Sequence, residues 1–500
     1  MNKNLRRRLP CILVTSLLFI ALFMFMGILI STKIVPTKFL LIIGGLFLLV
    51  TLCVFLLTWD TRRLKSFIFG CIIMMLVLII LIVGSCYLNR AVETLDRITT
   101  VDVETAEVGV FVRQEDSATD LSDLVGYRFG IMEKLDRDNT NKAVSLLEKE
   151  IGTDLDIIEY PGLEEMADAI LTEKSVDVLV FNTAYLDMLV ELDGYKEIAS
   201  QLRLIHSQTI ETKIESIKKP ENNSWGLWDT LGSQQEEVKG NTFTMYISGI
   251  DSRNGLISKS RSDVNILAVI NPDTRQILLV STPRDFYVPL PISNGAPDKL
   301  THAGIYGVDV SMGTLEMLYD IDIDYYFRVN FSGFEKIVDA LDGITVYSDV
   351  SFTAKNESGE FYFREGENHI YGEAALAFAR ERKAFSEGDR KRGENQMKVI
   401  KAVIEKAMSP TLLTNYASIM DSVSGSFETS MPYDKIAELV RNQLDNGGSW
   451  NIVSTSVNGT GDSQIPYSMS SYAYVMIPDQ TTVDAAKAKI QQVYTGEFVQ

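Results

Sequence analysis

The chain has 500 residues, too many for one ordinary domain, so we expect two or three folded units. Residues 1–90 contain ten Lys or Arg and one acid, whereas residues 91–500 contain 37 Lys or Arg and 65 Asp or Glu. A part this acidic repels a phosphate backbone, which disfavours nucleic acid as a partner. All four cysteines lie within the first 86 residues. This placement excludes a disulfide framework or a thiolate zinc site in the remainder.

Three apolar stretches near the N-terminus are long enough to cross a membrane as helices, which takes roughly 20 residues each. They cover residues 11–30, 39–58 and 67–87 of a predicted membrane anchor over residues 1–90. A signal peptide has one short apolar core, so a retained multi-pass anchor is indicated. The leader and the second loop carry more basic residues than the first loop, so we expect the N-terminus in the cytoplasm. Three crossings then leave the large C-terminal part outside the cell membrane.

Residues 105–215 alternate apolar stretches with amphipathic ones. VGVFVRQ, YRFGIM and VDVLVFN have the composition of strands, and NKAVSLLEKEIG and LEEMADAILTE have apolar residues at helical spacing. The pattern predicts a small α/β or α+β accessory domain. It contains no nucleophile and base at a recognisable spacing, so we expect a spacer or a partner-binding module. The polar residues 216–241 that follow are predicted to be a linker.

Residues 242–500 are predicted to form a second, larger domain. TFTMYISGID, SDVNILAVIN and RQILLVSTPRD indicate strands that end in charged residues, and several amphipathic helices follow them. Strands alternating with helices favour a central sheet with helices on its faces, and ligands of such folds bind beyond the strand ends. We expect residues 411–500 to add helices and a few strands to this domain.

Four short segments of the second domain place charged side chains together. Arginines in such positions are usually solvated or paired with a nearby acid, and each segment alone is a weak signal. Their recurrence in an acidic domain is more informative. The segments are ISGIDSRNGLISKSRSD, with Asp251, Arg253, Arg261 and Asp263; STPRD, with Arg284 and Asp285; ALAFARERK, with Arg380 and Arg382; and GDRKRGENQ, with Arg390, Arg392 and Gln396.

Both signs of charge are explained if these segments meet around a diphosphate. Guanidinium groups bind phosphate oxygens bidentately, so converging arginines suit a pyrophosphate. Carboxylates are repelled by that ligand unless a hard cation lies between them, and Mg²⁺ commonly uses one or two carboxylates together with phosphate oxygens. His302 is one of only three histidines, and we expect it to be a structural hydrogen-bonding residue. No P-loop, GxSxG or HExxH motif occurs.

The chain resembles the LytR–CpsA–Psr family, specifically its capsule-associated, CpsA-like members. The resemblance is carried, in this order, by SRSDVNILAV, PRD, KLTHAGIYG, NFSGFEKIVDALDGITV, AFARER and GDRKRGENQ. The three-span anchor and the extra domain resemble the same branch. The resemblance implies an α/β/α catalytic domain with a central mixed sheet and a buried lipid tunnel. It also implies a Gram-positive type of cell envelope.

The activity implied by the resemblance is that of a phosphotransferase outside the membrane. Such enzymes move a glycopolymer from a polyprenyl-pyrophosphate carrier to peptidoglycan through a phosphodiester. The branch resemblance favours a capsular polysaccharide as the polymer, and teichoic acid stays open. Their implied partners are the lipid-linked glycan, the peptidoglycan acceptor, the membrane and capsule-assembly proteins.

The resemblance also implies roles for individual residues. Asp251 and Asp263 would hold Mg²⁺, and Asp263 would accept the proton of the attacking hydroxyl. Arg284 would act on the reacting phosphate. The residues implied to bind the pyrophosphate are Arg261, Arg284, Arg380, Arg382, Arg392 and Gln396. Many relatives have a glycine where Lys391 stands, and a second basic residue and a glutamine near Gln396, where this chain has Asn395 and Met397.

Two alternatives stay open at the level of sequence. A polyprenyl-phosphate-binding regulator of capsule synthesis needs no chemistry at the site, although the predicted cytoplasmic part is too small for a DNA-binding domain. A lipid pyrophosphatase uses the same residues with water in place of a sugar hydroxyl, and the sequence does not distinguish the two acceptors.

Overall fold

The computed structural model describes residues 3–59, 63–99, 103–192, 194–213, 240–250, 259–356, 359–386, 388–409, 425 and 427–500. Contacts within the chain divide it into two compact units. The first comprises Met1–Thr100, Met408–Ser424 and Met431–Ser449. The second comprises Val101–Ala407, Gly425–Ser430 and Trp450–Gln500.

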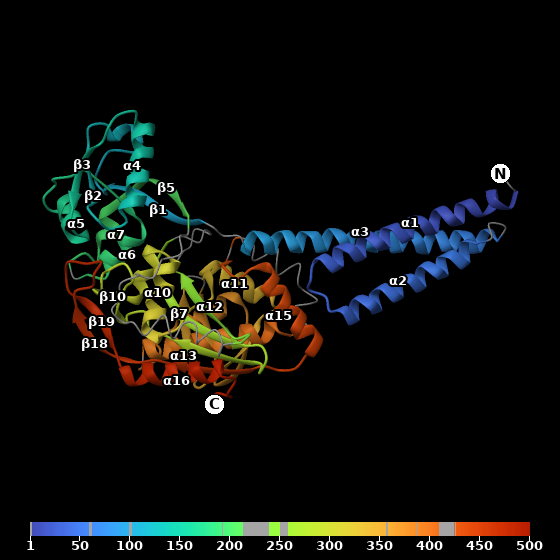
Figure 1. Cartoon of the computed structure of the whole chain (residues 1–500). Helices are drawn as coiled ribbons and strands as arrows, with labels where there is room; N and C mark the ends of the chain where they lie inside the picture. The colour runs from blue at the N-terminus through green and yellow to red at the C-terminus, as the bar shows by residue number, and fades with distance from the viewer. Residues whose placement is uncertain are drawn as a thin grey trace. The chain divides into compact units, whose positions relative to one another are not determined.

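Three long apolar helices dominate the first unit: α1 (Lys3–Ser31), α2 (Thr37–Thr58) and α3 (Leu64–Thr99). Stretches of 24, 22 and 27 residues within them are long and apolar enough to cross a membrane, which confirms the three predicted spans. The helices pack side by side (Figure 1), around a small core that includes Leu18 and Leu81. Most of their other large apolar side chains are exposed, as expected for helices that face lipid.

A fourth helix of the first unit, α15 (Tyr433–Asn446), comes from late in the chain. Its first residues bind the loop between α1 and α2. Lys33 Nζ donates to Asp434 Oδ2 at 2.8 Å, and the Tyr433 hydroxyl donates to Thr32 O at 2.7 Å. We expected this segment to complete the catalytic domain, but these contacts group it with the apolar helices instead.

The second unit begins with a five-stranded mixed sheet in the order β3-β2-β4-β1-β5. Strand β2 is parallel to β3 and β4, whereas β1 is antiparallel to β4 and β5. The strands are β1 (Val103–Arg113), β2 (Arg128–Met132), β3 (Asp156–Tyr160), β4 (Val178–Asn182) and β5 (Leu202–Lys213). The helices are η1 (Leu121–Leu124), α4 (Arg137–Ile151), α5 (Leu163–Leu171), α6 (Ala184–Val190) and α7 (Ile198–Gln201).

Helices cover both faces of this sheet. Leu147 of α4 packs with Val110 and Val180 on one face. Met166 of α5 and Leu189 of α6 pack on the other face. The arrangement is α/β in three layers, and the strands and helices expected from the sequence are all present.

A six-stranded mixed sheet follows, in the order β16-β11-β6-β7-β8-β17. Strands β6, β7 and β8 are antiparallel neighbours, while β11 runs parallel to β6 and β17 runs parallel to β8. Two of the strands come from the C-terminal stretch, as expected. They are β6 (Phe243–Ile250), β7 (Ser262–Asn271), β8 (Gln276–Ser281), β11 (Tyr325–Asn330), β16 (Phe427–Thr429) and β17 (Asn451–Ser456).

Helices α9 (Leu300–Tyr306), α10 (Val308–Tyr319) and α16 (Gln480–Tyr494) share a core with Leu278 and Val280 of β8. Helix α13 (Asp389–Ala407) lies against the other face, because a Cβ added at Gly393 would meet Ser281 Oγ at 3.7 Å. Alternate residues of a strand point to opposite faces. The sheet is therefore sandwiched between helices, which confirms the expected α/β/α fold.

The remaining described elements form a further apolar cluster and four small two-stranded antiparallel sheets, β9–β10, β12–β15, β13–β14 and β18–β19. Phe352 and Phe378 belong to that cluster with parts of α11, α12 and α13. The lipid tunnel remains a prediction. The elements are α11 (Phe331–Ala340), α12 (Gly372–Arg380), β9 (Tyr287–Pro289), β10 (Pro297–Lys299), β12 (Ile344–Ser348), β13 (Phe352–Asn356), β14 (Gly359–Phe363), β15 (Gly366–Ile370), β18 (Gly459–Gln464) and β19 (Ala473–Pro478).

Candidate active site

One edge of the six-stranded sheet collects the ends of its central strands. Ile250, the last residue of β6, pairs with Ser262 at the start of β7 and with Asn330 at the end of β11. Ser281, the last residue of β8, pairs with Ile266 of β7. Residues that precede β7 or follow β6, β8 and β11 therefore leave the sheet at the same edge, where ligands of open α/β sheets bind.

Arg284 and Asp263 form an ion pair at this edge. Arg284 Nη1 donates to Asp263 Oδ1 at 2.8 Å, and its Nε lies 3.6 Å from Asp285 Oδ2. The Arg284 side chain is only 16% exposed. Burial lowers the pKa of Arg284, but the charges of Asp263 and Asp285 outweigh burial and raise that pKa above its usual range. The guanidinium is therefore charged at every relevant pH.

Lys299 and Arg261 extend this pair into a longer series of contacts. Lys299 Nζ lies 3.8 Å from Asp285 Oδ1 and donates to Glu191 Oε2 at 2.7 Å. Arg261 Nη1 donates to the other oxygen of the same carboxylate, Glu191 Oε1. We call the resulting series the ionic chain. Its members, in order of contact, are Arg261, Glu191, Lys299, Asp285, Arg284 and Asp263.

Glu191 stays ionised within the ionic chain. Burial alone raises the pKa of Glu191, but the charge and hydrogen bond of Lys299 and then the charge of Arg261 outweigh it and lower this pKa to about 2. Lys299 is 3% exposed. The Glu191 side chain itself is 26% exposed, and a carboxylate held between two cations keeps its charge.

The sequence analysis missed both Lys299 and Glu191. Lys299 is the first residue of the KLTHAGIYG segment, so its charge next to this segment could have been noticed in the sequence. Glu191 had no such signal, because it follows α6 of the five-stranded part and reaches the site only through folding.

Arg380 lies at the same edge of the sheet. It is the last residue of α12, and its guanidinium carbon lies 4.1 Å from the centroid of the Phe331 ring. Phe331 directly follows Asn330, the end of β11. Helix α12 ends at Arg380, and the backbone is extended at Glu381. Arg382, two residues after Arg380, is exposed.

Arg392 and Gln396 occupy the first two turns of α13, four residues apart and hence on one side of the helix. Gly393 between them lies against Ser281, so this end of α13 also reaches the edge. Lys391, just before Arg392, donates to Asp349 Oδ2 at 2.6 Å and to Glu394 Oε2 at 2.9 Å. Lys391 therefore forms ion pairs with two acids that are not members of the ionic chain.

Several buried donors near this edge lack hydrogen-bond partners among the described residues: Arg261 Nε, Arg284 Nε, Asn330 Nδ2 and Asn395 Nδ2. Leaving a buried donor unpaired costs about 1–3 kcal/mol. A ligand rich in acceptor oxygens, such as a diphosphate, would satisfy such donors. The chemistry of these atoms fits the predicted anion.

The predicted metal pair is only partly described. Asp251 and Arg253 lie outside the described residues. Asp263 is described, and Ser262 before it pairs with Ile250, the residue before Asp251. The described ranges contain no group of three or more potential metal ligands. Mg²⁺ needs only one or two carboxylates when phosphate supplies the rest, so Asp263 fits the predicted role, which stays a prediction.

His302 is structural, as expected. Its Nδ1 lies 2.7 Å from Asp298 Oδ1 and 3.0 Å from Ser468 Oγ, and both His302 and Asp298 are fully buried. These contacts tie α9 to the C-terminal part of the chain.

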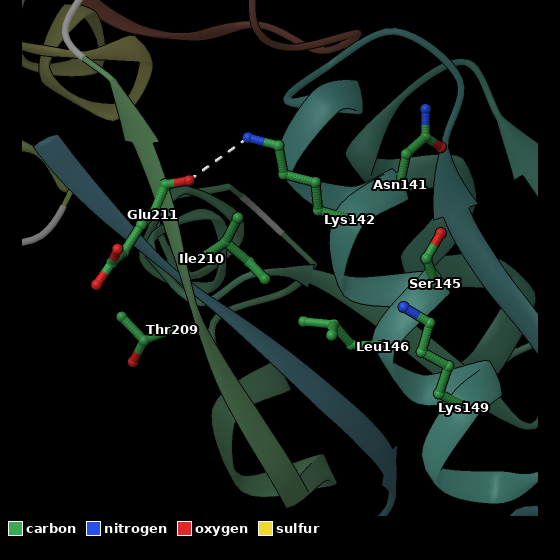
Figure 2. Close-up of a pocket in the computed structure, with 8 residues that line it drawn as sticks. All are labelled: Asn141, Lys142, Ser145, Leu146, Lys149, Thr209, Ile210 and Glu211. Carbon is green, nitrogen blue, oxygen red and sulfur yellow. Dashed lines mark hydrogen bonds between the residues drawn. The ribbon is translucent and has the colours of Figure 1, made fainter.

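A separate open pocket lies between α4 and β5 of the five-stranded part (Figure 2). Lys142 and Lys149 of α4 extend along it, and Lys142 Nζ donates to Glu211 O at 3.4 Å. No histidine, cysteine or aspartate lines this pocket.

Comparisons with known proteins identify the family to which the chain belongs. Residues 203–492 match the sequence profile of the "LytR_cpsA_psr family". Polyisoprenyl-teichoic acid–peptidoglycan teichoic acid transferase TagU of Bacillus cereus (strain AH820) is 31% identical over 252 residues, which are 50% of this chain and 76% of TagU. TagU of Oceanobacillus iheyensis is 34% identical over 221 residues, 43% of this chain and 66% of that protein.

Among solved structures, that of B. subtilis TagV is 27% identical, with a TM-score of 0.43. It covers 52% of this chain and 98% of the TagV chain. The family profile spans more than half of the present chain, and B. cereus TagU is matched over three quarters of its length. On this evidence the chain is a member of the LytR–CpsA–Psr family.

Proposed function

We propose that the protein is a membrane-anchored phosphotransferase that moves a glycopolymer from a polyprenyl-pyrophosphate carrier to cell-wall peptidoglycan, forming a phosphodiester. The observation that carries the proposal is the Arg284–Asp263 pair at the sheet edge, where Arg284 Nε makes no hydrogen bond among the described atoms and has only a 3.6 Å contact with Asp285 Oδ2. The similarity to TagU supports the same class of reaction, because TagU is named as a transferase of polyisoprenyl-linked teichoic acid to peptidoglycan.

The reaction needs no separate energy source, because the pyrophosphate is an activated anhydride. A hydroxyl oxygen of peptidoglycan attacks the glycan-side phosphorus, the bond from that phosphorus to the bridging oxygen breaks, and polyprenyl phosphate leaves. Asp263 takes the proton of the hydroxyl. Arg261, Arg284 and Arg380, with Arg382, Arg392 and Gln396, bind the phosphate oxygens and stabilise the charge that develops on them.

Mg²⁺ belongs to this proposal as the cation between Asp251, Asp263 and the diphosphate, where it would neutralise phosphate charge. Asp263 then has two roles, since its Oδ1 already accepts from Arg284. We propose that the pair with Arg284 orients this carboxylate toward the reacting phosphate.

We propose capsular polysaccharide as the polymer, because the three-helix anchor and the additional five-stranded domain resemble the capsule branch of the family. The two TagU relatives, in contrast, are named as transferases of teichoic acid. Supplying the enzyme with each lipid-linked polymer in turn distinguishes the two.

The contacts of α15 support the proposed membrane topology. The α1–α2 loop binds α15, a segment that follows all three spans in sequence. That loop and the C-terminal part share one side of the membrane if α1, α2 and α3 each cross it once. The basic leader assigns the opposite side to the cytoplasm.

The decisive experiment uses the full chain purified in detergent, with Mg²⁺, a lipid-linked glycan and peptidoglycan. The expected product is polymer covalently linked to peptidoglycan, and Arg284→Ala should abolish it. Arg137→Ala, which removes an arginine paired with Glu159 on the five-stranded part, is the matched control. Release of free glycan phosphate without linkage would identify a hydrolase, and lipid binding without turnover would identify a regulator.

A further inference from the structure

One carboxylate from outside the catalytic sheet holds two cations of the candidate active site. Glu191 Oε1 accepts from Arg261 Nη1, and Glu191 Oε2 accepts from Lys299 Nζ at 2.7 Å. The side chains of Arg261 and Lys299 are 11% and 3% exposed, so water solvates them poorly. Asp187, one turn earlier in α6, approaches Arg261 Nη2 only to 3.6 Å.

The position of Glu191 is set by a continuous apolar core. Met188 and Leu189 of α6 are buried in the same cluster as Ile305, Met469 and Ala473, which come from the catalytic part of this unit. Glu191 is therefore delivered to the site by packed structure rather than by an isolated surface contact.

The geometry of this carboxylate resembles that of a bound phosphate. Two oxygens of one anion accept from a guanidinium and an ammonium, the same two donor types that bind phosphate in proteins. Since Lys299 and Arg261 keep the pKa of Glu191 at about 2, the side chain carries its full charge at neutral pH. A substrate phosphate that approaches Arg261 meets this charge already in place.

We propose that Glu191 occupies the position of a substrate phosphate group between Arg261 and Lys299, and that the lipid-linked pyrophosphate displaces it on binding. This inference rests on the proposed function. The five-stranded domain then sets the affinity of the site for its substrate, because it supplies an intramolecular competitor. Displacement also breaks the ion pairs that join the end of α6 to Arg261 and Lys299, while the apolar contacts of α6 remain, so substrate binding and the accessory domain are coupled.

The test measures binding of inorganic pyrophosphate to the full chain in detergent with Mg²⁺. Glu191→Gln keeps the shape of the side chain and removes its charge, and we expect about ten- to a hundredfold tighter binding. Asp187→Asn should tighten binding by less, because its contact is longer. Glu197→Gln, an exposed acid on the same domain, is the matched control and should bind as the wild type does.

Two further measurements separate displacement from a general loss of negative charge. In an Arg261→Gln background, the gain in affinity from Glu191→Gln should be smaller than in the wild type, because one of the two cations for which Glu191 competes is gone and only Lys299 remains. In the wild type, pyrophosphate should increase amide hydrogen exchange in α6, a readout that needs no variant to fold.

Unchanged or weaker pyrophosphate binding by Glu191→Gln, or increased protection of α6 in the wild type, would overturn the inference. The proposed function would survive that result if the wild type bound pyrophosphate and Arg284→Ala weakened the binding. If the wild type failed to bind pyrophosphate at all, both would be wrong.

Discussion

Two arginines of the catalytic domain, Arg328 and Arg284, each contact two carboxylates, yet their surroundings differ. Arg328 lies within β11, is 3% exposed, and donates from Nη1 to Glu104 at 2.6 Å and to Glu428 at 2.7 Å. Arg284 follows β8 at the sheet edge, is 16% exposed, and has an Nε that makes no hydrogen bond among the described atoms.

The difference separates a structural ion cluster from a binding site. Arg328 joins three strands, because Glu104 begins β1 and Glu428 lies in β16. Burial lowers the pKa of Arg328, but the charges of Glu428 and Glu104 outweigh it and raise that pKa. Arg284 also contacts two acids, Asp263 and Asp285, but it lies where the strand ends meet, and its Nε makes no hydrogen bond among the described atoms. The number of nearby acids is therefore a poor guide to function, whereas location and unmet hydrogen bonds are good ones.

The largest expected effect is on stability and comes from Arg328→Met. Removing one partner of a buried ion cluster leaves the charges of Glu104 and Glu428 uncompensated, so we expect a loss of about 3–5 kcal/mol in the free energy of unfolding. Denaturant titration of the full chain in detergent, followed by circular dichroism, measures it. Arg364→Met, at an exposed arginine, is the control and should change stability little. A loss below about 1 kcal/mol for Arg328→Met would contradict the structural assignment.

Arg284→Ala should act on the rate instead. Loss of one preorganised donor to a developing charge costs about 10²- to 10³-fold in rate. We expect a decrease of that size in the initial rate of polymer–peptidoglycan linkage. Arg284→Lys keeps the positive charge but loses the planar guanidinium group, so its rate should lie between that of the wild type and that of Arg284→Ala. Equal rates for Arg284→Ala and the wild type would remove Arg284 from the site.

A smaller effect is expected at Arg380, which is oriented by the Phe331 ring. A cation–π contact contributes about 0.5–2 kcal/mol. Phe331→Leu should therefore raise KM for the lipid-linked donor by about three- to tenfold and leave kcat nearly unchanged. Steady-state kinetics over a range of donor concentrations checks this, and Phe361→Leu in a separate apolar cluster is the control. A fall in kcat with constant KM would indicate a different role.

The smallest effect concerns pH and tests the structural cluster again. Burial, and next the charge of Glu104, raise the pKa of Asp309 from 3.8 to about 6. The folded state thus holds this proton more tightly than the unfolded state, so this group lowers stability as pH rises from about 4 to about 6. After allowance for partial exposure, Asp309→Asn should stabilise the protein by about 1 kcal/mol at pH 7.5 and hardly at all at pH 4.

Glu191 should change the stability with pH in the opposite direction to Asp309, since the pKa of Glu191 is lowered from 4.5 to about 2. Its stabilising contribution is complete above about pH 4.5 and is lost as pH falls toward about 2. Unfolding curves of Asp309→Asn and Glu191→Gln between about pH 2 and pH 8 therefore form a matched pair, because this range contains the titration of both groups. Destabilisation by Asp309→Asn at pH 7.5 would contradict the raised pKa.

Much of the fold could be predicted from local pattern. The three spans, the strands that became β6, β7 and β8, and the charged residues that follow them were all visible as periodicity and position. The position of α15 was not, because its amphipathic pattern is satisfied equally by a catalytic core or by a neighbouring loop. Its partner Lys33 lies 401 residues away in sequence.

Some residues of the candidate site could likewise be predicted from the sequence, and others could not. Arg261, Asp263 and Arg284 could be proposed because each adjoins a predicted strand, and strand ends of one sheet converge. Lys299 was passed over because a single lysine in an apolar segment has many explanations.

The amino-acid sequence by itself determined the membrane spans, the alternation of strands and helices, and the charges at the strand ends, because these depend on side chains close together along the chain. Only the tertiary structure decided which charges meet. Glu191 binds Arg261 and Lys299 across 70 and 108 residues, and no local pattern records such a pairing. The reason is physical: the free energy of an ion pair depends on distance and solvent exposure, and both are set only when separate segments pack.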